Sequence, residues 1–121
     1  MNPDGTPHPS NGRATIDDDD NDYWFGYEQE YFIMDVDTQL PVGFPVGGYP
    51  GPQGVYYCSV GGKNTHWRAF VEEHADICLQ SGINFEAINH EVSGGHWDFP
   101  VFAKGPKRPV ESLRVARDLL E

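Results

Sequence analysis

The chain has 121 residues and a formal net charge of −11, and 38% of its residues are hydrophobic. This length and composition predict one domain with a modest core. The negative charge excludes a nucleic-acid partner, whose phosphates need Lys and Arg. No stretch is long or apolar enough for a membrane helix, and the N-terminus lacks the pattern of a signal peptide. We therefore expect a cytoplasmic protein without a membrane partner.

Residues 1–22 are polar, proline-containing and acidic. They are predicted to form a linker that lacks fixed structure or lies along another domain. Much of the negative charge lies in the aspartate run at 17–20. We interpret this run as solvated linker rather than a calcium loop, because it lacks the alternating ligands and closing glutamate of a helix–loop–helix calcium site.

A first strand is predicted over about 23–36, because this segment is rich in aromatic residues. Glu28 and Glu30 are two residues apart, so their side chains share one face of the strand, roughly 7 Å apart. Two like charges in an otherwise apolar strand are unfavourable unless something neutralises them. A divalent cation is the simplest candidate, and a solvated polar face is the alternative.

The middle of the chain is predicted to hold a long loop and a helix. Pro and Gly at 41–54 exclude regular structure, and interleaved aromatic residues favour an ordered, packed loop. Apolar residues recur at helical spacing over 65–80, with Thr65 as a plausible N-cap. His74 and Cys78 lie on the apolar face, and we interpret both as packed core residues rather than ligands.

A second acidic pair, Glu91 and Asp98, flanks the glycine pair 94–95, which is typical of a two-residue hairpin loop. In that register Glu91 lies directly opposite Asp98, with Cβ atoms about 5 Å apart on one face. A cation would again relieve the repulsion, and an all-oxygen site favours Mg²⁺ or Mn²⁺ over Zn²⁺. A final helix is predicted from about Pro109.

Four segments also resemble motifs of one family. They are WFGYEQEY at 24–31, GYPGPQGVYYC at 48–58, AINHEV at 87–92 and HWDF at 96–99. In this order they are similar to W-F-G-x-E-Q-E-Y, G-[FY]-P-G-P-Q-G-x-Y-Y-C, I-N-x-E-V and Q-W-E-F of type II, eukaryotic-like glutamine synthetases. The resemblance implies an α+β fold, a curved antiparallel sheet with flanking helices. Residues 23–121 would form the first part of the catalytic domain, after a missing N-terminal domain and truncated at the C-terminus.

The resemblance implies a ligase of nitrogen metabolism that makes glutamine from glutamate and ammonia. ATP would phosphorylate glutamate, and ammonia would displace phosphate from the γ-glutamyl phosphate, with Mg²⁺ or Mn²⁺ as cofactor. The family forms homo-oligomeric rings. Carried over by motif, Glu28 would hold one metal ion, and another would be held by Glu30, Glu91 and Asp98. Tyr57 would line the ammonium pocket. The ATP contacts would be Trp24, Glu28 and the segment Asp98, Phe99, Pro100, Val101, Phe102 and Ala103.

Three residues depart from the family pattern: His96 and Pro100 replace glutamines, and Asp98 replaces a glutamate. Asp98 is one methylene shorter, so the strand or the ion must move closer for it to bind. His96 is interpreted either as a nitrogen ligand that favours Mn²⁺ over Mg²⁺ or as a surface histidine at the turn. Because later ligands of the family are absent, we expect an enzyme piece that needs the rest of its chain. The alternative is an inactive remnant that at most binds Mn²⁺ or Mg²⁺.

Overall fold

The computed structural model describes residues 1–16 and 22–121. The aspartate run at 17–20, and with it the choice between linker and calcium loop, lies outside the described residues. In chain order the elements are the 3-10 turn η1 (Gly12–Thr15), β1 (Trp24–Phe32), the 3-10 turn η2 (Gly62–Asn64), α1 (Arg68–Gln80), β2 (Asn89–His90), β3 (His96–Lys104) and α2 (Lys107–Leu120). Among the described residues, neither α-helix has the length and apolar character needed to cross a bilayer.

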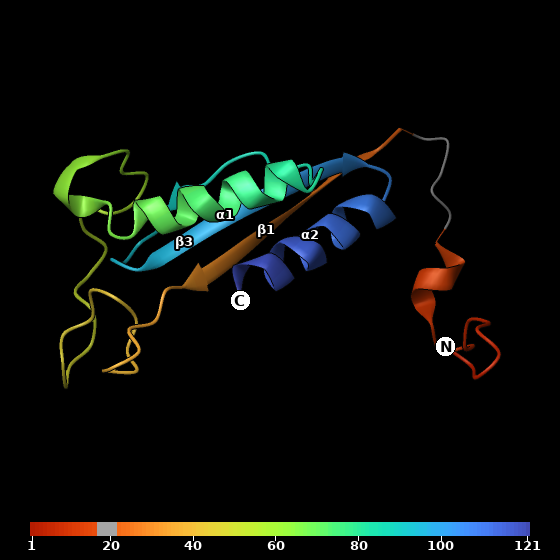
Figure 1. Ribbon diagram of the computed structural model, residues 1–121, viewed down its shortest axis with the longest axis horizontal. Helices are drawn as coiled ribbons and strands as arrows, with labels where there is room; N and C mark the ends of the chain where they lie inside the picture. The colour runs from red at the N-terminus through yellow and green to blue at the C-terminus, as the bar shows by residue number, and fades with distance from the viewer. Residues whose placement is uncertain (17–21) are drawn as a thin grey trace.

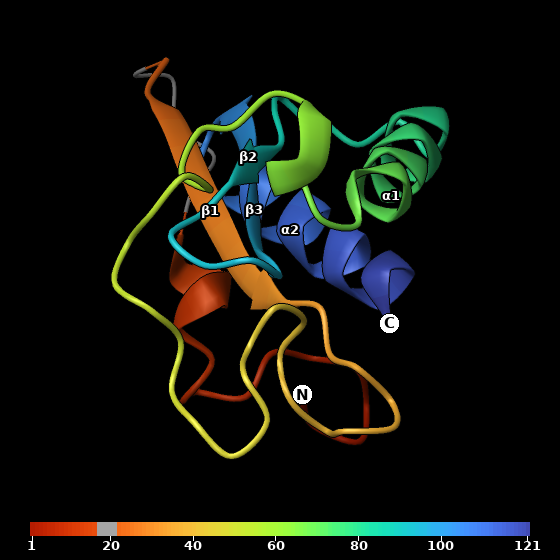
Figure 2. The same cartoon turned by 90° about the vertical axis from the view of Figure 1, so that its left-hand side faces the viewer.

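The three strands form one antiparallel sheet in the order β1–β3–β2. The long β1–β3 pair runs from Trp24 opposite Lys104 to Phe32 opposite His96. Both helices lie on the same side of the sheet (Figures 1 and 2), which leaves its other face without a helix. This arrangement confirms the expected α+β class, an antiparallel sheet with flanking helices.

The hydrophobic core lies between the sheet and the two helices. The buried residues that form it are Cys78, Ile83, Phe99, Val101 and Ala116. His74 is only 3% exposed, its Nε2 lies 2.8 Å from the carbonyl oxygen of Ala116, and its ring packs against Phe99 at 5.1 Å. The interpretation of His74 and Cys78 as core residues is therefore confirmed.

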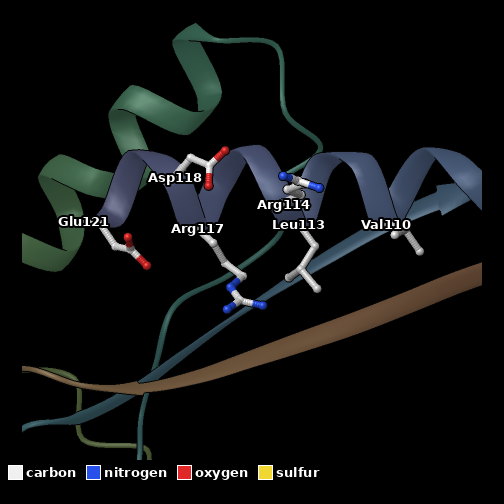
Figure 3. Close-up of a pocket in the computed structure, with 6 residues that line it drawn as sticks. All are labelled: Val110, Leu113, Arg114, Arg117, Asp118 and Glu121. Atoms are coloured by element: carbon white, nitrogen blue, oxygen red, sulfur yellow. The ribbon is translucent and has the colours of Figure 1, made fainter. Parts of the chain in front are cut away.

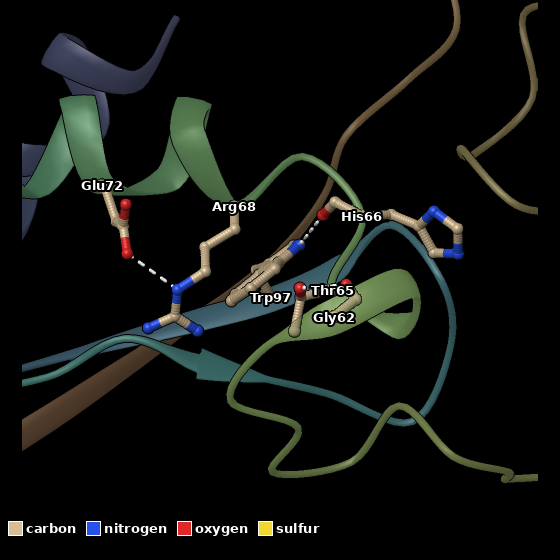
Figure 4. A network of polar contacts seen from close by, with 6 residues as sticks. All are labelled: Gly62, Thr65, His66, Arg68, Glu72 and Trp97. Carbon is tan, nitrogen blue, oxygen red and sulfur yellow. Dashed lines mark hydrogen bonds and ion pairs between the residues drawn. The ribbon is translucent and has the colours of Figure 1, made fainter.

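The helices begin at other residues than predicted. Thr65 does not cap α1: its hydroxyl donates to the carbonyl of Gly62 and closes η2 (Figure 4). Trp67 then adopts a left-handed conformation with φ 63°, and the helix begins only at Arg68. The second helix begins two residues before Pro109, which costs nothing there because N–H groups of a first helical turn have no intrahelical partner.

The predicted loop and strand ends are only partly correct. β1 ends at Phe32, because the Asp35 carboxylate accepts hydrogen bonds from the backbone N–H groups of Asp37 and Thr38 and closes a turn. In the loop at 41–54, Phe44 packs edge-on against Phe32 at 6.0 Å, whereas Tyr49 is 93% exposed. The loop is therefore anchored at its start and not packed along its whole length.

Part of the N-terminal segment has regular structure. Residues 12–15 form η1, and the side chain of Arg13 forms an ion pair with Glu111 of α2. Within the segment predicted to lack fixed structure or to lie along another domain, these residues thus form a turn that contacts α2. The ion pair is exposed on both sides, so it contributes at most about 1 kcal/mol of stability.

The two cysteines should differ sharply in reactivity. Both are free thiols, but Cys58 is exposed and Cys78 is fully buried, and burial raises the pKa of the Cys78 thiol to about 11. Because the thiolate is the reactive form, iodoacetamide at mildly alkaline pH should modify only Cys58 in the folded chain. Mass spectrometry should find a second adduct only in denaturant. Rapid double labelling without denaturant would contradict the packed core around Cys78.

Candidate metal centre

The sheet face opposite the helices carries a group of acidic side chains. Alternate residues of a strand share a face, so Glu28 and Glu30 of β1 lie on the same face as His96 and Asp98 of β3. Glu91, just after β2, joins them. One carboxylate oxygen from each of Glu28, Glu91 and Asp98 lies within 4.8 Å of the other two. The structure thus brings together three of the four acids that the sequence selects as metal ligands.

Asp98 is the buried member of this group and is 0% exposed. Its Oδ1 accepts a hydrogen bond of 2.7 Å from the Asn89 amide, but its buried Oδ2 has no partner among the described residues. The Asp98 carboxyl raises the pKa of Glu28, first because the two groups can share a proton and then because their charges repel. A buried carboxylate oxygen without a donor, beside two more acids, fits a divalent cation that prefers oxygen ligands.

The hairpin that carries Glu91 and Asp98 does not have the predicted register. Asn89, not Glu91, lies directly opposite Asp98, so the pairing is shifted by two residues. The N–H of Glu91 donates to the carbonyl of His96, and the N–H of His96 donates to Ser93, which makes a wider loop than two residues. A shift of two preserves the face on which each side chain lies. Glu91 therefore still reaches Asp98, diagonally.

The two glycines of this loop are explained by packing rather than by turn geometry. Neither Gly94 nor Gly95 has the positive φ that a tight primed turn requires. A Cβ on Gly95 would lie 2.9 Å from the carbonyl oxygen of Val42, closer than such atoms approach. The loop at 41–43 thus packs directly on the hairpin backbone, and this contact sets the register.

Glu30, the fourth predicted metal ligand, lies outside the group of three acids. It is directly opposite Asp98 on β3, but its Oε2 lies 3.0 Å from Nε2 of His96. His96 is only 8% exposed and its ring stacks on Phe32, so the interpretation as a surface histidine is wrong.

The predicted ATP contacts are divided between the two faces of the sheet. Trp24, 65% exposed, lies on the face of Glu28, as do Pro100 and Phe102 of β3. The side chains with the opposite orientation are buried in or beside the core under the helices, namely Phe99, Val101 and Ala103. These three can contact a ligand on the acidic face only through their backbone.

Tyr57 lies in the loop next to the acids and is 52% exposed. The pKa of its phenol is raised, chiefly by the charge of the neighbouring Cys58 thiolate and then by that of Glu91. Cys58 has a positive φ of 57°, and its N–H donates to the carbonyl of His90 at 2.8 Å. This bond attaches the loop that carries Tyr57 to β2, at the residue next to Asn89, which contacts Asp98.

Sequence reasoning missed two residues that support the acids. The Asn89 amide donates to Asp98. The sequence could have indicated this, because Asn89 is two residues from Glu91 and therefore shares its face of the strand. His90 stacks on Trp97 at 4.3 Å, its Nδ1 lies 2.9 Å from the Ser59 hydroxyl and its Nε2 lies 2.9 Å from the carbonyl oxygen of Gly94. Burial lowers the pKa of His90, which favours the neutral ring. Nothing local in the sequence indicates this network.

Trp97 is fixed from a second side by the segment before α1. Its indole N–H donates to the carbonyl of His66 at 3.1 Å, and Arg68 at the start of α1 bonds Glu72 (Figure 4). Because Trp97 and Asp98 are consecutive on β3, these contacts hold the strand from the helix face while Asp98 points to the acidic face.

Two hollows among the described residues lie away from the acids. One of about 360 Å³ is lined by residues of α2 and by Glu121, which follows it (Figure 3), namely Val110, Leu113, Arg114, Arg117, Asp118 and Glu121. A wider one of about 640 Å³ lies among the end of β1, the start of α1 and the end of α2. Neither includes Glu28, Glu91 or Asp98, whereas a third hollow of about 270 Å³ is lined in part by Val92, Ser93 and Gly94, directly after Glu91.

Comparison with known proteins identifies the family. No protein-family model matches the chain. The chain is 54% identical to a glutamine synthetase of Rhizobium meliloti over 99% of its own length and 36% of the relative's. It is 52% identical to that of Bradyrhizobium diazoefficiens and 42% identical to a cytosolic isozyme of Pinus sylvestris, again over about a third of each relative. The chain spans about a third of the length of these curated relatives. Over the residues that it contains, it belongs to the glutamine synthetase family.

Proposed function

We propose that the chain supplies one wall of the active site of a glutamate–ammonia ligase, which forms glutamine from glutamate, ammonia and ATP. The names of its relatives support the reaction class. The single observation that supports the site is the convergence of Glu28, Glu91 and Asp98, with the buried Oδ2 of Asp98 lacking a donor. We further propose a cytosolic location, in keeping with the cytosolic isozymes among its plant relatives, and a ring-forming assembly, as the resemblance to the family implies.

In this proposal the three acids hold Mg²⁺ or Mn²⁺, which supplies charge neutralisation for the transferred phosphoryl group. Asn89 donates to Oδ1 of Asp98, which leaves the buried Oδ2 available to a cation. Because the pKa of Glu28 is raised, cation binding at this carboxyl would compete with its protonation. We assign Tyr57, whose phenol senses the charge of Glu91, to the ammonium pocket, where its oxygen would accept from an ammonium ion.

The open acidic face also explains why this wall needs more chain around it. Asp98 is buried, but Glu28 is exposed and Glu91 half-buried on a sheet face without a helix, where water weakens electrostatic interactions. The remaining two thirds of the relatives' length are the proposed source of the groups that cover the face and bind the phosphates. We therefore place turnover in the assembled protein and cation binding in this chain.

A chimera tests the ligase function. This chain would replace the corresponding 36% of the Rhizobium meliloti relative, and glutamine would be measured with ATP, glutamate and ammonia. We expect glutamine formation that requires all three substrates and is lost with Glu91→Gln. Glu73→Gln, an exposed acid of α1 on the other side of the sheet, is the matched control and should leave the rate unchanged.

A cation-binding remnant without catalysis is the second candidate, favoured by the short side chain and Asn89 contact of Asp98. A chimera that assembles and binds Mn²⁺ at the three acids, yet makes no glutamine, would support it over the ligase. A chain that binds no divalent cation would refute both candidates.

A further inference from the structure

The orientation of Glu30 is the least expected feature of the acidic face. In the sheet register Glu30 lies directly opposite Asp98, whereas Glu28 lies opposite Pro100. Its carboxylate nevertheless does not join the three acids, and Oε2 lies 3.0 Å from Nε2 of His96 instead. The side chain of Glu30 is 62% exposed, and this hydrogen bond holds its carboxylate beside His96.

His96 is well suited to fix that charge, because its own ring is held by packing. The residue is 8% exposed, and its ring stacks on Phe32 with centroids 4.3 Å apart and planes 16° apart. Phe32 is its direct partner in the β1–β3 register and packs in turn against Phe44. A carboxylate accepts only, so Nε2 must carry the hydrogen in this contact.

We propose that His96 is a positioning residue that holds Glu30 apart from the cation site, so that Glu30 becomes a ligand only when this hydrogen bond breaks. The inference rests on the proposed cation site at Glu28, Glu91 and Asp98. It assigns a role to a histidine that stands where the family motif has glutamine. His96 acts through Glu30 and does not itself touch the cation.

The consequence is a competition between His96 and the cation for one carboxylate. A hydrogen bond to a charged group typically contributes enough free energy to change a binding constant about tenfold. Removing the donor should therefore tighten Mg²⁺ or Mn²⁺ binding by about tenfold, because Glu30 is free to turn toward Asp98. If His96 were a nitrogen ligand instead, its removal would weaken binding.

A double-mutant cycle tests this coupling on the 121-residue chain. Mn²⁺ and Mg²⁺ dissociation constants would be measured by calorimetry for the wild type, His96→Phe, Glu30→Ala and the double variant. Phe retains a ring that can stack on Phe32 but has no donor, so the variant is expected to fold. His96→Gln keeps a donor and should stay near the wild-type affinity, and His8→Ala, which removes an exposed imidazole, is the control.

We expect His96→Phe to tighten binding in the wild type and to have no effect once Glu30 is alanine. The nitrogen signals of His96 offer a readout independent of affinity. Saturation with Mg²⁺ should shift the Nε2 resonance in the wild type and leave it unchanged in Glu30→Ala. Equal effects of His96→Phe in both backgrounds, or weaker binding, would overturn the inference while leaving the cation site intact. Absence of cation binding in every variant would overturn the proposed function as well.

Discussion

Replacing Asp98 with asparagine should lower the affinity of the chain for Mn²⁺ by about a hundredfold, or ~2.7 kcal/mol. The substitution keeps the size of the side chain and its contact with Asn89, but removes one of the three negative charges that converge within 4.8 Å. An amide is a weaker ligand than a carboxylate for these cations, because it carries no net charge. Calorimetric titration of both chains with Mn²⁺ measures the difference directly.

The same substitution should have the opposite effect on stability without metal. Asp98→Asn removes the charge that repels Glu28, and its amide can donate from the position where Oδ2 has no partner. We expect a gain of about 1 kcal/mol in the free energy of unfolding by urea with a chelator present. Glu73→Gln should change neither quantity. If Asp98→Asn destabilised the chelated chain and kept its Mn²⁺ affinity, Asp98 would have a purely structural role.

The opposite effects of Asp98→Asn on Mn²⁺ affinity and on metal-free stability reflect a general property of metal sites. A buried carboxylate without a donor is unfavourable in the metal-free fold and favourable once a cation compensates its charge. Trp97, held by His66 and stacked on His90, fixes the strand that carries Asp98. The contacts of Trp97 on the helix side of the sheet thus hold Asp98 close to the other acids, although their charges repel one another.

The sequence predicts those parts of the site that depend on local pattern. Glu28 and Glu30 share a face because strand side chains alternate, and this holds whatever the neighbours are. The face of Glu91 was also correct, although its register was wrong by two residues. The error arose because glycines 94–95 were interpreted as turn residues, whereas they are needed for the close approach of Val42. The contact between Val42 and Gly95, which are far apart in the sequence, leaves no signal in either segment.

The orientation of individual side chains was beyond the sequence for the same reason. Alternation places Glu30 and His96 on one face but does not reveal that they bond each other. The choice depends on the stacking of His96 on Phe32, hence on the β1–β3 register. Likewise, the late start of α1 depends on Trp67, which adopts a left-handed backbone although its type favours no such conformation.

Replacing Phe99 with alanine should remove a large part of the stability of the chain. Phe99 is 0% exposed and its ring contacts Phe85 and His74, each at 5.1 Å, and Tyr31 at 6.2 Å. Such a truncation typically costs about 3–5 kcal/mol, from lost burial and the cavity left behind. A domain of this size has a total stability of about 5–15 kcal/mol, and this core is modest. Urea denaturation followed by circular dichroism would measure the loss.

Phe70 on α1 provides the matched control, because it is the same residue type but 40% exposed. Phe70→Ala should cost less than half as much, since a half-exposed ring buries less area and leaves no closed cavity. The comparison also separates the two faces of β3. If Phe99→Ala lost no more stability than Phe70→Ala, the β3 side chains under the helices would not form the core. The strand would then lack the support that holds Asp98 toward the other acids.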